Sequence, residues 1–216
     1  MKFRPSHLVF LACGSAALLN QSALAIVTEY YWDSNGSGTG GSDSTTANGT
    51  WGSSAYWSAD STGASSTANT VMSSSYGVHF SAGTNVTGDS TVTLNANKSV
   101  GSIYFDEGTV TLSGYTLTLG SSLTGSGNGI INSVLAGSSR LSKTGTGTVK
   151  LTGANTFTGE IVINGGVLNI QNSAALGTTA GGVSSSANNA ELQLQGGISI
   201  GAEALTLRGT GQSNTI

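Results

Sequence analysis

Residues Ser142–Leu176, SKTGTGTVKLTGANTFTGEIVINGGVLNIQNSAAL, decide the fold class of this chain. They place short segments of alternating apolar side chains between glycines and a Gly-Ala-Asn-Thr-Phe-Thr-Gly turn. Alternation with period two predicts half-buried β-strands. Nothing in the stretch can act as a nucleophile–base pair, a metal cluster or a phosphate loop. The stretch is therefore typical of a building unit of a long stacked β structure.

The same alternation recurs in short, β-branched-rich segments along most of the chain. Turn residues separate these segments, as in the glycine run 125–129, and no helical segment lies between them. This pattern excludes α/β crossovers and leaves a sandwich, a barrel or a solenoid. Two observations favour the solenoid. Asn-Gly turns, which join the strands of hairpins, are scarce. The apolar residues are mostly Val, Ile and Leu, as expected where each turn of a solenoid stacks like residues on like. The segments are 91–95, 109–112, 115–119, 148–152, 160–164, 167–171, 191–195 and 204–208.

Residues 1–25 predict a signal peptide. Lys2 and Arg4 form a basic start, a short apolar run follows over 8–19, and an Ala-Leu-Ala cleavage signal ends the segment. We therefore expect cleavage between Ala25 and Ile26. The apolar run is shorter than the about 20 residues that a membrane span needs, so a stop-transfer anchor is the less favoured alternative and no membrane span is expected.

Charge and cysteine content limit the classes of partner. The chain has seven Lys and Arg against ten Asp and Glu, and two basic residues lie in the leader. A mature chain with an acidic excess argues against nucleic acid and anionic lipid as partners. Cys13 also lies in the leader, so the exported chain has no disulfide framework. Only 8% of residues are charged, but the period-two pattern predicts order over 76–210.

Residues 26–75 form a distinct zone before the solenoid, which we expect over 76–216 and beyond. All three tryptophans, Trp32, Trp51 and Trp57, lie in this zone among Ser, Gly and Thr. The favoured interpretation is an N-terminal cap, because the first rung of a solenoid has to be covered and large aromatic side chains cover area efficiently. The alternative is a glycan-binding platform on which these rings stack against sugars.

The segment from Leu141 to Gly159, followed by Val162–Leu168, closely resembles a known family. It is similar to the autotransporter-associated β-strand repeat, also called the passenger-associated transport repeat, and the resemblance covers about 141–170. Tyr-Trp-Asp at 31–33 is also similar to the start of such proteins. The resemblance implies a right-handed parallel β-helix in a secreted passenger of a Gram-negative-type bacterium, without enzymatic activity. The motif positions are Lys143, Gly145, Gly147, Leu151, Gly153, Asn155, Thr156, Phe157, Gly159, Gly165 and Leu168.

Residues suited to catalysis are few. His79 is the one histidine after the leader, so a Ser-His-Asp site has to use it, and no G-x-S-x-G elbow presents a serine. Asp106 and Glu107 are adjacent carboxylates before a glycine, which favours a turn over the converging pair that glycosidic chemistry requires. Asp33-Ser-Asn-Gly36 lacks the later ligands of a calcium loop. We therefore predict no catalytic, cofactor or metal site.

These observations predict an exported, non-catalytic surface protein, the N-terminal part of a β-helical autotransporter-like passenger or adhesin-like stalk. Its expected partners are the secretion machinery and surface glycans or host and matrix surfaces. One alternative is a glycan-binding module that uses the Trp/Tyr cluster, and a more distant one is a polysaccharide-active β-helix enzyme. Within the repeat, we expect five side chains to point into the core, namely Leu151, Ile161, Ile163, Leu168 and Ile170.

Overall fold

The computed structural model describes residues 28–36, 38–52, 55–65, 67, 73–185 and 187–209. Within these residues the chain forms strands and turns and contains no helix, and thus no helix long and apolar enough to cross a membrane. The predicted signal peptide, with its cleavage between Ala25 and Ile26, lies outside the described residues. The described part is a β-solenoid of about six turns, which confirms the predicted all-β solenoid.

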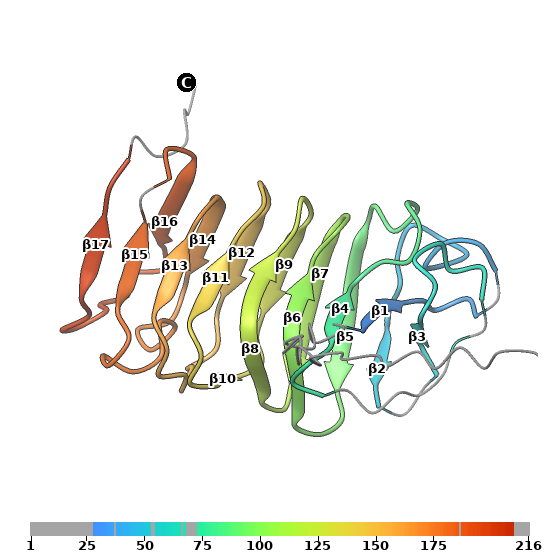
Figure 1. Cartoon of the computed structure of the whole chain (residues 1–216), viewed down its shortest axis with the longest axis horizontal. Helices are drawn as coiled ribbons and strands as arrows, with labels where there is room; N and C mark the ends of the chain where they lie inside the picture. Colours follow the sequence, from blue (N-terminus) through green and yellow to red (C-terminus); the bar gives the residue numbers. More distant parts are fainter. Residues whose placement is uncertain are drawn as a thin grey trace, which may run out of the picture.

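The chain winds so that most turns of the solenoid contribute strands to two sheets (Figure 1). The first sheet contains β1 (Glu29–Trp32), β3 (Trp57–Ser58), β4 (Gly77–His79), β6 (Lys98–Tyr104), β8 (Leu117–Thr124), β10 (Leu135–Ala136), β11 (Leu141–Lys143), β13 (Ile161–Ile163), β15 (Val183–Ser185) and β17 (Leu205–Leu207). The second contains β2 (Gly49–Trp51), β5 (Asp89–Leu94), β7 (Thr109–Gly114), β9 (Asn128–Ile131), β12 (Thr148–Leu151), β14 (Gly166–Ile170) and β16 (Ala190–Leu194).

Neighbouring strands pair in parallel, apart from β3, which runs antiparallel to β1. In the repeat segment, Val149 of β12 lies beside Gly129 of β9 on one side and Leu168 of β14 on the other. These partners are 20 and 19 residues away, so one turn of the solenoid takes about 20 residues there. A side chain therefore meets its counterpart from the next coil, which is the stacking that the uniform apolar positions predicted.

In strands such as β5, β7 and β12, alternation sends one set of side chains into the core and the other towards the surface. In β13 and β14 both sets are buried. All five side chains expected to point inward are buried, none of them more than 1% exposed, so that prediction is confirmed. Thr158, between the strands, is exposed. From β5 to β16 of the second sheet one column of paired positions is aliphatic, and its members are Val92, Leu112, Ile131, Leu151, Ile170 and Leu194. In β2 the same column begins with Gly49.

Most ends of the predicted strands were right to within two residues, but three predictions differ from the structure. The strand predicted over 115–119 continues as β8 to Thr124. Asn128 and Gly129 begin β9, so the interpretation of 125–129 as turn alone was wrong. A Cβ at Gly129 would overlap the Phe105 ring, so this strand position needs a glycine to admit the phenyl group. Tyr115 stands outside the strand that was predicted to begin there, with 56% of its surface exposed.

Candidate functional site

The repeat segment is the first candidate, and Lys143 is its least expected member. Lys143 lies on β11 in an inward column, beside Leu123 of β8 and Ile163 of β13, and is 1% exposed. Its Nζ donates to the carbonyls of Thr144 at 2.9 Å, Gly145 at 3.4 Å and Gly165 at 3.0 Å. An ammonium has three N–H donors, so the three carbonyls match its capacity. Burial lowers the pKa of Lys143 to about 8.

The glycines after Lys143 form the turn that leads into β12. Gly145 has a φ of 76°, a conformation that costs glycine little and other residues more. A Cβ at Gly147 would overlap the carbonyl oxygen of Gly127, its counterpart in the preceding coil. The turns of successive coils thus stack backbone on backbone. The motif needs glycine at 145 for its positive φ and at 147 for this close contact.

Asn155 links three successive coils. Its side-chain oxygen accepts the N–H of Leu135 at 2.8 Å, and its amide nitrogen donates to the carbonyl of Ala175 at 2.7 Å. Each partner lies 20 residues away, one coil in either direction. The side chain is 5% exposed, so both bonds form away from water and leave no buried amide group unpaired.

The remaining motif residues also serve the packing of coils. Leu151 and Leu168 belong to the core, and Thr156 is exposed. A Cβ at Gly153 would approach the carbonyl oxygen of Ser133 to 2.6 Å, and one at Gly159 would overlap that of Ser139. A Cβ at Gly165 would meet Gly145 O at 3.2 Å. The leucines and glycines of the motif thus face the core or neighbouring coils, whereas Thr156 presents its hydroxyl to solvent.

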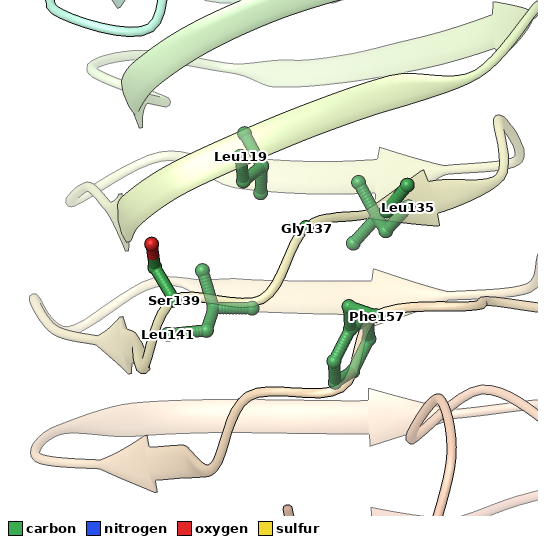
Figure 2. Close-up of a pocket in the computed structure, with 7 residues that line it drawn as sticks. Leu119, Leu135, Gly137, Ser139, Leu141 and Phe157 are labelled. Atoms are coloured by element: carbon green, nitrogen blue, oxygen red, sulfur yellow. The ribbon is translucent and has the colours of Figure 1, made fainter.

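Phe157 closes a small cavity where β10 and β11 replace one longer strand (Figure 2). The cavity has a volume of about 10 Å³, room for at most one water molecule. A larger, open hollow of about 440 Å³ lies among the N-terminal loops, and no charged or aromatic side chain lines it. Its lining residues are Thr39, Gly40, Ser61, Thr62, Gly83, Thr84 and Asn85.

The three tryptophans form an aromatic cluster at the N-terminal end of the solenoid. Each of Trp32, Trp51 and Trp57 is 1% exposed. Trp57 packs edge-on against both of the others at 5.0 Å between ring centroids, and Phe80 joins the cluster. Since their faces meet other rings and not solvent, the alternative of glycan contact through Trp32, Trp51 and Trp57 is not supported.

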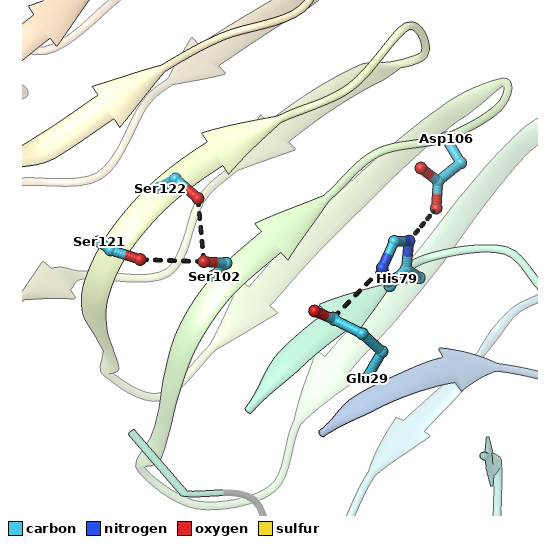
Figure 3. Close-up of polar contacts among 6 residues, drawn as sticks. All are labelled: Glu29, His79, Ser102, Asp106, Ser121 and Ser122. Carbon is cyan, nitrogen blue, oxygen red and sulfur yellow. Dashed lines mark hydrogen bonds and ion pairs between the residues drawn. The ribbon is translucent and has the colours of Figure 1, made fainter. Parts of the chain in front are cut away.

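His79 is the centre of a second polar candidate, on the outer side of the first sheet (Figure 3). Its Nδ1 lies 2.8 Å from Asp106 Oδ2, and its Nε2 lies 3.3 Å from Glu29 Oε2. The ring is stacked between Tyr31 at 4.5 Å and Tyr104 at 4.1 Å. The three aromatic rings occupy paired positions on β1, β4 and β6, so the group joins three coils.

This geometry does not form a Ser-His-Asp site. Both nitrogens of His79 face carboxylates, so neither faces a hydroxyl that it could deprotonate. The nearby serines bond one another instead: Ser102 Oγ lies 2.9 Å from both Ser121 Oγ and Ser122 Oγ (Figure 3). The two adjacent carboxylates differ in their environment. The carboxylate of Asp106 pairs with His79, whereas burial raises the pKa of Glu107.

Asp33, at the end of β1, is a buried carboxylate. It is 0% exposed, and its Oδ1 accepts the backbone N–H of Asn35 at 3.1 Å. Burial raises the pKa of Asp33 to about 6. Among the described residues no three His, Cys, Asp or Glu side chains gather in a way that could hold a metal ion.

Comparison with known proteins gives the repeat segment a family. The model of the family described as Passenger-associated-transport-repeat matches residues 141–170. This chain carries a passenger-associated transport repeat. It is also 49% identical over 86 residues to the adhesin BmaC autotransporter of Brucella suis biovar 1 (strain 1330). That match covers 40% of this chain and 2% of the adhesin, so the chain spans a small part of its relative. No solved structure matches the chain.

The passenger-associated transport repeat can now be described by contacts. Its lysine bonds the carbonyls of the glycine turn, its glycines let turns stack, and its asparagine bonds the coils on both sides. The His79 group was missed by sequence reasoning. Tyr31 and His79 are 48 residues apart and His79 and Tyr104 are 25 apart, so the 20-residue period of the repeat gives no signal for it.

Proposed function

We propose that this chain is part of the exported passenger of an autotransporter, with an adhesin-like role at or beyond the outer surface of a Gram-negative-type bacterium. The observation that carries the proposal is the passenger-associated transport repeat at 141–170, which lies within a solenoid whose parallel strand pairing continues on either side. The similarity to an autotransporter adhesin over 86 residues supports it. In this proposal residues 1–25 are a signal peptide, 26–75 a cap and 76–216 a right-handed solenoid.

The surface of the solenoid supports adhesion in preference to catalysis. Its polar side chains bond from coil to coil, as do Thr124 and Thr144 at 2.7 Å, and Asn164 and Ser142 at 2.9 Å. On the second sheet Asn169 donates to Gln193 at 3.0 Å. Polar pairs of this kind occur at several places along the solenoid. Each contact is weak, so binding to a host, matrix or glycan surface depends on repetition.

The test compares one copy with many. We expect purified exported chain to bind host cells or matrix feebly, and beads that display many copies to bind at least about a hundredfold better. Beads that carry an unrelated exported β domain at equal density serve as the control. Tight binding of single copies to one small molecule, or no gain from display, would contradict the proposed role.

The secretion part of the proposal has its own test. N-terminal sequencing of the exported protein should begin at Ile26, because the Ala-Leu-Ala signal ends at Ala25. Protease added to intact cells should then remove the chain if it reaches the outer surface. A mature protein that begins at Met1, or one that external protease leaves intact in unbroken cells, would contradict exported surface display.

A further inference from the structure

The loop that follows β1 contains a buried carboxylate with one oxygen that lacks a partner. Asp33 is 0% exposed, and its Oδ1 accepts the N–H of Asn35 at 3.1 Å. Its Oδ2 is also buried and has no hydrogen-bond partner among the described residues. A buried carboxylate oxygen without a partner is costly, because it has given up its water for nothing in exchange. This oxygen therefore needs a donor or a cation.

A second oxygen of the same loop is in the same state. Asn35 Oδ1 is buried and has no hydrogen-bond partner in the described part of the chain. The amide nitrogen of Asn35 donates to Asp43 Oδ1 at 3.1 Å, so a second carboxylate lies next to this side chain. Asp43 is exposed, which leaves that side of the group open to water. The two unpartnered atoms are both acceptors, so neither can satisfy the other.

Hydrogen bonds within the loop and to the following coil hold these groups in place. Both the backbone N–H and the hydroxyl of Ser34 donate to the carbonyl of Gly41, at 2.8 Å and 3.0 Å. The N–H of Gly41 donates to Asn85 Oδ1 at 2.9 Å. These bonds join the two arms of the loop, so the residues on either side of Ser34 stay close to Asp43. A group that is ordered before it binds a ligand loses little conformational freedom on binding.

The charge around the loop is negative. Burial raises the pKa of Asp33 most, and the charges of Asp43 and Asp60 raise it further. Residues 26–97 contain five acidic residues and no lysine or arginine. Among the described residues, three acids do not gather closely enough to hold an ion by themselves, and the oxygens of Asp60 bond hydroxyl groups of its own loop. An ion at this place therefore has to use the amide oxygen as well.

We propose that Asp33, Asn35 and Asp43 bind a calcium ion. Calcium takes about six to eight oxygen ligands from carboxylates, amide carbonyls and water, and its flexible coordination suits two carboxylates and one amide with water on the open side. The sequence Asp33-Ser-Asn-Gly36 predicted no metal site because it lacks the later ligands of a calcium loop. The closed loop supplies Asp43 in their place. Since the chain gives few ligands, we expect a dissociation constant of about 10⁻⁴ to 10⁻³ M, as in extracellular modules.

The test is a calorimetric titration of the purified chain with calcium chloride, after a chelator has removed bound metals. We expect one ion per chain, and a dissociation constant raised at least about tenfold by Asp33→Asn or Asp43→Asn. Because Asp43 is exposed, its variant should fold even if Asp33→Asn does not. Asp89→Asn is the matched control, since Asp89 is an exposed acid that is not among the charges acting on Asp33. No binding at about 10 mM calcium, or equal losses in all three variants, would overturn the proposal.

Urea unfolding separates a specific site from the screening of negative charge. With free calcium at about ten times the dissociation constant, the unfolding equilibrium constant should fall about tenfold, and Asp43→Asn should abolish most of this change. Magnesium at the same concentration should have a clearly smaller effect, because it requires near-octahedral geometry and gives up its water reluctantly. Equal effects of the two ions, or of calcium on the wild type and Asp43→Asn, would show screening only and would refute the calcium site.

Discussion

Replacing Lys143 with methionine isolates the effect of a buried amine on stability. Methionine has a similar length and no proton to gain or lose, so the substitution keeps most of the packing beside Leu123 and Ile163. It also removes the donor to three backbone carbonyls at every pH. The pH dependence of stability therefore distinguishes the titration of the amine from the loss of its hydrogen bonds.

The size and direction of the effect follow from the pKa. Burial lowers the pKa of Lys143 from 10.5 to about 8. Between these values the unfolded chain keeps a proton that the folded chain has released, so the free energy of unfolding rises with pH over this window. At about 1.4 kcal/mol for each pH unit, the gain is about 3 kcal/mol, complete above the unfolded pKa and absent below pH 8.

The assay is urea unfolding at intervals from pH 7 to pH 11, followed by fluorescence of the buried tryptophans. The difference in unfolding free energy between the wild type and Lys143→Met should shift by about 3 kcal/mol in favour of the wild type as pH rises. Taking the difference removes groups that titrate in both proteins, such as Tyr31 and Tyr104, whose pKa values burial raises. Parallel curves would show that the three carbonyls hold the ammonium as well as water does, and a shift of opposite sign would show that they hold it better. Either result would refute the lowered pKa.

Three further predictions concern stability and use the same urea assay. Ile163→Asp should cost at least about 3 kcal/mol or prevent folding, since it buries an unpaired carboxylate, whereas exposed Thr158→Asp should cost less than about 0.5 kcal/mol; equal midpoints would refute the inward assignment. Gly147→Ala should cost more than about 2 kcal/mol because its Cβ overlaps the turn below, and Gly165→Ala should cost clearly less; the reverse order would exclude stacking as the cause. As pH rises from 4 to 6, the free energy of unfolding of the wild type should fall by about 3 kcal/mol relative to that of Asp33→Asn. The reason is that the carboxyl of the unfolded chain releases its proton at a lower pH than the buried carboxyl of the folded chain. A difference independent of pH would exclude a raised pKa of Asp33.

The regular part of the solenoid could be predicted from sequence because it depends on local pattern. Alternation within β5, β7 and β12 places one face in the core, and these strands follow that pattern, whereas every residue of β14 is buried. Asn128 and Gly129 resemble turn residues in the sequence, although they begin β9. The need for Gly129 comes from Phe105, one coil earlier, and a single sequence does not show which ring lies above which glycine.

The polar contacts were harder to predict, since they join residues across coils of unequal length. The motif resemblance marked Lys143 as structural, but its three carbonyl partners include Gly165, 22 residues away. His79 was identified as the only histidine of the mature chain, without its partners. Its two carboxylate partners are Glu29, in the first described strand, and Asp106, two residues after β6. The irregular N-terminal coils bring them together. The aromatic rings of 26–75 predict either a cap or a glycan platform, and the burial of the three tryptophans gives the platform no support.

The contacts of the repeat also explain why the chain carries so little charge. Each coil in the middle of the solenoid is covered on both sides by a neighbouring coil. A charged side chain that points inward can therefore find hydrogen-bond partners in its own coil or in these two neighbours, which lie about 20 residues away in the sequence. Lys143 does so with backbone carbonyls that the glycine turn supplies, and its burial still lowers the pKa. Outward positions meet a different limit, because like residues stack on like from coil to coil and equal charges would repel at close range. Neutral hydroxyls and amides bond along such rows instead, as Thr124 does with Thr144. A surface assembled under these limits presents repeated, neutral hydrogen-bonding groups, which is the chemistry of weak, multivalent contact.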